Sequence, residues 1–167
     1  AMYFSTGGRR TRSALYRVSF KGENKGGAPA GKPELLDLRR GLEAGGEPAG
    51  LLAHEDWRIR HAARTAVEQK LLAGGKVALE GDDRLGVIEA VIAWARCSGK
   101  GSPELRKELL GHLQRLDLDA LDSSGKISWL RALGLVCMRL GEPTDAERAA
   151  LAKRLEPRFP SGDEQVD

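Results

Sequence analysis

The sequence of 167 residues is poor in cysteine and aromatic residues, and it has no long apolar run. Phe, Trp and Tyr make up 5% of the chain. A membrane-spanning helix needs about 20 mostly apolar residues, so we expect no membrane span. The first residues also lack a basic segment followed by an apolar stretch, and we therefore expect no signal peptide in this chain.

The two cysteines, Cys97 and Cys137, are far apart in the sequence and lie in strongly apolar stretches. Structural metal sites and redox motifs need close cysteine pairs, and the chain contains neither CxxC nor CxxCH. We therefore favour buried free thiols over a disulfide. The cysteine count does not decide the cellular compartment.

Positive charge is concentrated near the N-terminus. Residues 1–40 contain nine Lys and Arg and three Asp and Glu, whereas the other 127 residues carry a net charge of −3. A basic segment of this kind can bind phosphates or an acidic partner. We favour a solvated loop over nucleic-acid binding, because aromatic residues do not alternate with the basic ones.

Apolar periodicity divides the chain into four parts. Residues 1–20 favour a β-strand pair, because apolar residues roughly alternate over 15–20 and the glycines at 7 and 8 offer a turn. From Pro33 onward, apolar residues recur at helical spacing between capping residues. The predicted segments are a strand pair (1–20), a linker (21–32), a helical domain (33–160) and a frayed tail (161–167).

The fold class predicted from this pattern is all-α, with a short N-terminal β-hairpin. About six helices joined by short loops favour a HEAT/ARM-like α-α superhelix over a closed bundle. Trp57 and Trp129 begin comparable apolar helices, which is a faint sign of repetition. The helices around Val91 and Val136 are apolar on most sides, and we expect both to be buried between neighbours.

The segment 51–67 resembles the second helix of a HEAT repeat. In that family an acidic helix start precedes a hydrophobic residue, an arginine and a pair of alanines, and Ile59, Arg60, Ala62 and Ala63 fill these positions. The resemblance implies that Arg60 reaches acidic groups at neighbouring helix starts. Small alanines would also allow paired helices to approach closely.

A broader resemblance covers nearly the whole chain. Residues 2–20 look like the closing strands of a dehydrogenase-type β-propeller, and residues 116–143 and 155–160 are similar to the helical region that follows it in large secreted planctomycete-type proteins. The resemblance implies an extracytoplasmic or periplasmic location, an oxidoreductase-like parent protein and a chain that is a piece of it. Because CxxCH is missing and the propeller is confined to about 20 residues, neither haem binding nor sugar or quinone chemistry is carried over.

Catalytic, cofactor and metal sites are not expected. His54 and His61 could share a helical face, but no HExxH-like spacing accompanies them, so we favour capping and packing. Asp117, Asp119 and Asp122 fail the calcium-loop pattern because Leu121 stands at a ligand position. The sequence also lacks a G-x-S-x-G serine and a phosphate-binding glycine loop.

An interaction surface is the remaining functional hypothesis. The candidate residues are Trp57, Arg58, Arg60 and Arg64, followed by Arg9, Arg10 and Arg12. The sequence therefore predicts a non-catalytic α-solenoid scaffold or protein-interaction module within a larger oxidoreductase-like protein. The alternative is a binder of nucleic acid or another anionic partner through the basic N-terminal segment. The oligomeric state stays open.

Overall fold

The computed structural model describes all residues except 1, 7–13, 20, 23–31, 49, 78 and 80–82. The chain divides into two compact units, Ala1–Lys32 and Pro33–Asp167. The predicted linker falls almost wholly outside the described residues.

The first unit contains the predicted hairpin. Strand β1 (Met2–Thr6) pairs antiparallel with β2 (Ala14–Val18), with Phe4 opposite Tyr16. The rings of these two residues stack with their centroids 5.1 Å apart. Because side chains alternate between the faces of a strand, Phe4, Tyr16 and Val18 share one face, and all three are exposed.

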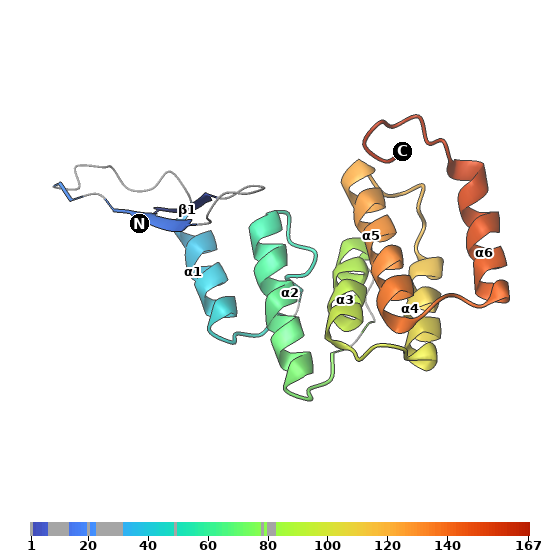
Figure 1. The fold of residues 1–167 in the computed structure, drawn as a ribbon, viewed down its shortest axis with the longest axis horizontal. Coiled ribbons are helices and arrows are strands. Elements are labelled where there is room, and N and C mark those ends of the chain that lie inside the picture. Colours follow the sequence, from blue (N-terminus) through green and yellow to red (C-terminus); the bar gives the residue numbers. More distant parts are fainter. Residues whose placement is uncertain are drawn as a thin grey trace. The chain divides into compact units, whose positions relative to one another are not determined.

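Six helices are described in the second unit, which is the number expected from the sequence. They are α1 (Pro33–Glu43), α2 (Trp57–Leu72), α3 (Arg84–Cys97), α4 (Pro103–Arg115), α5 (Ser123–Leu140) and α6 (Asp145–Leu155), followed by the 3-10 turn η1 (Glu156–Arg158) (Figure 1). Among the described segments, none of the helices is long and apolar enough to cross a membrane.

Side-chain hydrogen bonds cap the starts of α2, α3, α5 and α6. The T-x-x-E spacing at 144–147 predicts a capping box, and Thr144 and Glu147 form one at the start of α6, while Asp83 caps α3.

The sequence favours a helix start at residues 54–56 and a cap at Ser123 or Ser124, and both expectations are wrong by one to three residues. Asp56 caps α2 from outside its first turn, and Asp122, not the serines that follow it, caps α5 by accepting a hydrogen bond from Gly125 N.

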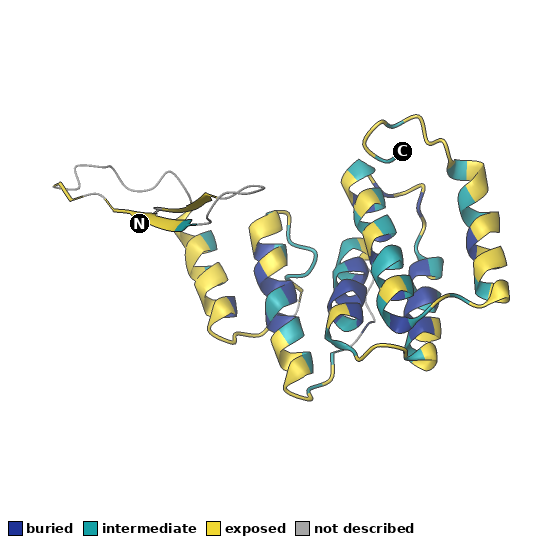
Figure 2. Ribbon diagram, viewed as in Figure 1, coloured by how far each residue is buried: buried dark blue, intermediate teal, exposed yellow. Residues whose placement is uncertain are grey.

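Helices adjacent in the sequence pack against each other from α1 to α5, and α3 also packs on α5. A small core between α1 and α2 contains Leu42, Ile59, Ala62, Ala63 and Ala66. A larger core joins α3, α4 and α5 and includes Leu151 of α6. Figure 2 shows the buried residues concentrated on α3, α4 and the facing sides of α2 and α5.

Helix α3 is buried over most of its surface, as predicted, but α5 is not. The buried residues of α5 are confined to one face: Gly125, Trp129, Ala132, Val136 and Leu140. Met138, on another face of the same helix, is 77% exposed. Neighbouring helices therefore cover α5 on one side only, although the composition of α5 is apolar on most sides.

Candidate functional site

The predicted site residues have different environments. Arg9, Arg10 and Arg12 lie outside the described residues. The remaining four residues all belong to the N-terminal half of α2. Trp57 and Arg58 are exposed, Arg60 is half-buried and Arg64 is buried, so only two of the four present most of their surface to a partner.

Trp57 is the first residue of α2 and is 59% exposed. The guanidinium carbon of Arg58 lies 4.8 Å from the centroid of its ring, within the range of a cation–π contact. The backbone N–H of Arg58 donates to Asp56 Oδ1 at 2.8 Å, which holds the start of the helix in place. By contrast, Trp129 is 1% exposed, so the two tryptophans that suggested repetition are not equivalent.

Arg60 has a different partner from the one that the resemblance implied. Its Nη1 donates to the carbonyl oxygens of His54 at 2.7 Å and Glu55 at 2.9 Å. Among the described residues, its hydrogen bonds thus go to backbone oxygens and not to an acidic side chain. The reason is local, because the turn directly before α2 places these two carbonyl oxygens within reach of Arg60.

Arg64 is buried and links α2 to α3. Its Nη1 donates to Glu89 Oε2 of α3 at 2.7 Å, and its side chain is 10% exposed. Its Nη2 donates to His61 Nδ1 at 2.9 Å, and because a guanidinium can only donate, this ring nitrogen carries no proton. Arg64 therefore stabilises the packing of α2 on α3 and has little surface left for a partner.

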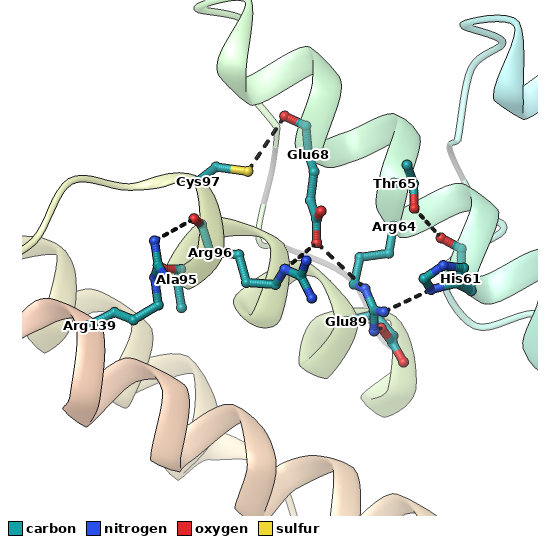
Figure 3. A network of polar contacts seen from close by, with 9 residues as sticks. All are labelled: His61, Arg64, Thr65, Glu68, Glu89, Ala95, Arg96, Cys97 and Arg139. Carbon is teal, nitrogen blue, oxygen red and sulfur yellow. Dashed lines mark hydrogen bonds and ion pairs between the residues drawn. The ribbon is translucent and has the colours of Figure 1, made fainter. Parts of the chain in front are cut away.

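Three charged residues that the sequence did not single out complete this cluster (Figure 3). Glu68 Oε1 lies 3.0 Å from Arg96 Nε and 3.7 Å from Arg64 Nε. Glu89 and Arg96 come from α3, and Arg64 and Glu68 from α2. The spacing of Arg64 and Glu68 signals a helical ion pair, but which face of α3 meets them is set by the fold.

Two other arginines, Arg139 and Arg106, also donate hydrogen bonds within the protein. On α5, Arg139 donates from Nε to the carbonyl oxygen of Ala95 and from Nη2 to that of Arg96, both at 2.9 Å. On α4, the buried Arg106 donates from Nε to Glu147 Oε2 of α6 at 3.3 Å. Arg139 adds to the close packing of α5 on α3, and Arg106 links α4 to α6, which share no close backbone contact. Both arginines are engaged within the protein, which reduces the number of cations available for binding.

The titratable groups show no activated nucleophile in the described part of the chain. Burial raises the pKa of the Cys97 thiol, and the nearby Glu68 adds to the effect. Burial also raises the pKa of Cys137. Because the thiolate is the reactive form, both thiols are less nucleophilic than a free cysteine at neutral pH. Both cysteines are free of disulfides, as predicted, although neither is fully buried.

The aspartates considered for calcium are engaged within the protein. Asp119 accepts two hydrogen bonds from Arg158, at 3.0 Å to Oδ1 and 2.7 Å to Oδ2. Asp117 Oδ1 accepts the backbone N–H of Asp119 at 3.1 Å. No three His, Cys, Asp or Glu side chains come together as metal ligands anywhere in the described ranges.

Two depressions are lined by described residues of the helical unit. One, of about 330 Å³, is open and lies between the starts of α3 and α5, where Asp83 and Asp122 line it. The other, of about 230 Å³, lies beside Trp129 and is lined by Lys126, Arg158 and Val166 among others. Both are at or below the lower end of the range for small-molecule sites, about 300–1,000 Å³.

Comparison with known proteins adds no relative. No protein-family model matches the chain, and neither a curated protein nor a solved structure is significantly similar to it. Functional inference therefore depends on the geometry described above.

Proposed function

We propose that this chain is a non-catalytic helical scaffold and protein-interaction module, and that it is not itself an enzyme. One observation carries this proposal: Trp57 is exposed at the start of α2 with the guanidinium of Arg58 stacked on it at 4.8 Å. Tryptophan and arginine are the side chains most enriched among residues that dominate the energy of protein interfaces.

The residues behind this pair support the proposal because they hold it rigidly. Arg60 closes the turn that precedes α2, and Arg64 ties the next turn of the helix to α3. Asp56 caps the helix directly before Trp57. A contact surface that is already ordered loses little conformational entropy when it binds. Arg60 and Arg64 thus act as positioning residues for the exposed pair.

The resemblance to HEAT-like helical regions suggests the partner. We take it to be a protein, and specifically another domain of a larger oxidoreductase-like protein. The first candidate is the β-propeller that precedes the helices in the planctomycete-type proteins that this chain resembles. Helix-on-helix packing from α1 to α5 agrees with a scaffold whose surface stays available along its length. The same resemblance suggests an extracytoplasmic or periplasmic location.

The experiment compares the intact chain with two variants. The chain is immobilised and exposed to a cell extract, and the proteins that it retains are identified by mass spectrometry. The most enriched protein is then purified, and its affinity for the chain is measured by calorimetry. A Trp57→Ala/Arg58→Ala variant should bind this protein at least 10-fold more weakly. A Met138→Ala variant is the matched control, because Met138 is 77% exposed on α5 and lies outside the proposed contact.

Equal affinity of all three proteins for the purified partner would refute the proposal. The alternative, an anionic partner bound by the basic N-terminus, is tested with a duplex DNA of 20 base pairs. Counterion release predicts a steep fall in its affinity as salt rises. Such binding, lost on Arg9→Ala/Arg10→Ala/Arg12→Ala and kept by the Trp57 variant, would favour the alternative.

A further inference from the structure

The hairpin of β1 and β2 exposes apolar side chains on both of its faces. Its exposed large apolar residues, which are 44–74% accessible, are Tyr3, Phe4, Leu15, Tyr16 and Val18. In the part of the chain that the structure describes, the sheet consists of these two strands, so each strand has one neighbour and one free edge. An isolated hairpin is marginally stable in water, and further strands or a covering helix are needed for independent stability. The free edges are therefore where this unit can gain stability.

The two edges of the sheet differ in how they are protected against pairing. Natural edge strands resist the addition of another chain through charged side chains, prolines or bulges. Strand β2 carries Arg17, whose side chain is exposed. Strand β1 (Met2–Thr6) contains no charged residue, proline or glycine, and it pairs with β2 residue by residue, without a bulge. The unprotected edge is therefore that of β1.

The occupant that this edge fits is β1 of a second copy of the chain. A two-fold axis at Phe4 pairs two β1 strands antiparallel, with Phe4 opposite its own copy and Tyr3 opposite Ser5 of the second copy. Because β1 is uncharged, no like charges meet in this register. Pairing two β2 strands about Tyr16 would instead bring the two Arg17 side chains to one face, at a diagonal separation of about 7–8 Å. Charge therefore favours the β1 edge over the β2 edge.

The same register extends an aromatic contact that each copy already has. Within one copy, Phe4 lies opposite Tyr16, and the two rings stack with their centroids 5.1 Å apart. Pairing of the β1 strands would place the two Phe4 side chains next to each other, so that one face carries a row of rings in the order Tyr16, Phe4, Phe4, Tyr16. Aromatic pairs across strands stabilise a sheet. The ring of Phe4, 44% exposed in one copy, would be covered on its free side.

We propose that this chain forms a two-fold symmetric dimer through antiparallel pairing of its β1 strands. The product is a four-stranded sheet in the order β2, β1, β1, β2. The free N–H and C=O groups of each β1 edge become paired, and the edges that remain belong to β2 and carry Arg17. Because the contact uses the same surface on both copies, it closes at two chains and does not grow into a fibre. The dimer uses other residues than the Trp57–Arg58 pair and does not depend on the function proposed for that pair.

The test measures the dissociation constant of the dimer by analytical ultracentrifugation of the intact chain. The wild-type chain should change from the mass of one chain to that of two as its concentration rises. Phe4→Lys places like charges opposite each other at the two-fold axis and should raise the dissociation constant at least 10-fold. Tyr16→Lys is the matched control, because it removes the same stacked pair and adds the same charge at a side chain of similar exposure, 48% against 44%. Since Tyr16 lies on the outer strand, this variant should change the constant less than threefold.

A mixing experiment separates charge at the axis from damage to the hairpin. Phe4→Glu alone should also dimerise at least 10-fold more weakly than the wild-type chain. An equimolar mixture of Phe4→Lys and Phe4→Glu should form a mixed dimer, because opposite charges then face each other at this position. Three results would overturn the proposal: a wild-type chain that stays monomeric at every concentration, a dimer weakened equally by Tyr16→Lys, and a mixture of the two Phe4 variants that remains monomeric.

Discussion

The guanidinium carbon of Arg154 on α6 lies 5.6 Å from the centroid of the Trp129 ring on α5. The two terminal nitrogens of the same arginine donate to the carbonyl oxygens of Gln114 and Leu116, at the end of α4. One side chain thus joins α6 to both neighbouring helices. Apart from η1, α6 makes no close backbone contact with another described element.

Replacing Arg154 should therefore loosen α6. Arg154→Met keeps most of the apolar stem but removes both hydrogen bonds, each worth about 0.5–1.5 kcal/mol. We expect the free energy of unfolding in urea to fall by about 1–3 kcal/mol. Arg148→Met, on the same helix with a side chain 62% exposed, should change it by less than about 0.5 kcal/mol. Equal stability of the two variants would contradict the role assigned to Arg154.

The sequence predicts local features of this fold better than long-range ones. The capping box of Thr144 and Glu147 could be recognised because both partners lie within one turn. The pair of Arg64 with Glu89 could not, because 25 residues separate them and their meeting depends on which face of α3 packs on α2.

In the candidate site, too, the local features can be predicted from the sequence and the long-range ones cannot. The sequence placed Trp57 and Arg64 on one helix correctly, but their exposure could not be predicted from it. Trp57 is exposed because it lies in the first turn, before the helix is covered by its neighbours, whereas Arg64 is two turns further on and faces α3. The one-sided burial of α5 could not be predicted for a related reason, because apolar composition alone does not indicate how many neighbours a helix has.

The one-sided burial of α5 makes a prediction of its own. Leu140 has no exposed surface and belongs to the large core, whereas Met138 is 77% exposed. Leu140→Ala should lower the free energy of unfolding by about 2–5 kcal/mol. Met138→Ala should change it by less than about 0.5 kcal/mol. A large loss of stability in the Met138 variant, measured by urea unfolding, would mean that α5 is covered on that side as well.

The stability of α6 should depend on acid pH through Glu147. Its backbone hydrogen bond from Thr144, together with the charge of Arg106, holds the pKa of the carboxyl below its usual range. A lowered pKa means that the stabilisation is present above the pKa of an ordinary glutamate, about 4.3, and is lost as the pH falls through the lower, folded-state value.

Thermal unfolding from pH 7 to pH 3 checks this dependence. Glu147→Gln should melt at a lower temperature than the wild-type chain at pH 7, and the difference should shrink towards pH 3. Glu108→Gln, at an exposed position of α4, should show a small difference that is the same at both ends of the range. A Glu147 difference that stays constant with pH would show that the charge of this carboxyl is not involved.

The two thiols should react slowly in the folded chain. Burial raises the pKa of both Cys97 and Cys137, so less thiolate is present at pH 7.5 than in an unfolded peptide. We expect alkylation by iodoacetamide, followed by mass spectrometry, to be several-fold slower than in 8 M urea. Reaction at the unfolded rate in the absence of urea would mean that the packing around these cysteines is open.

The most direct measurement for the proposed function is hydroxyl-radical footprinting of the chain, with and without saturating purified partner. Trp57 and Met138 are both easily oxidised and both largely exposed, so the chain contains its own control. If the Trp57–Arg58 pair is the contact surface, oxidation of Trp57 should fall several-fold in the complex while that of Met138 is unchanged. Undiminished oxidation of Trp57 in a saturated complex would contradict the proposal.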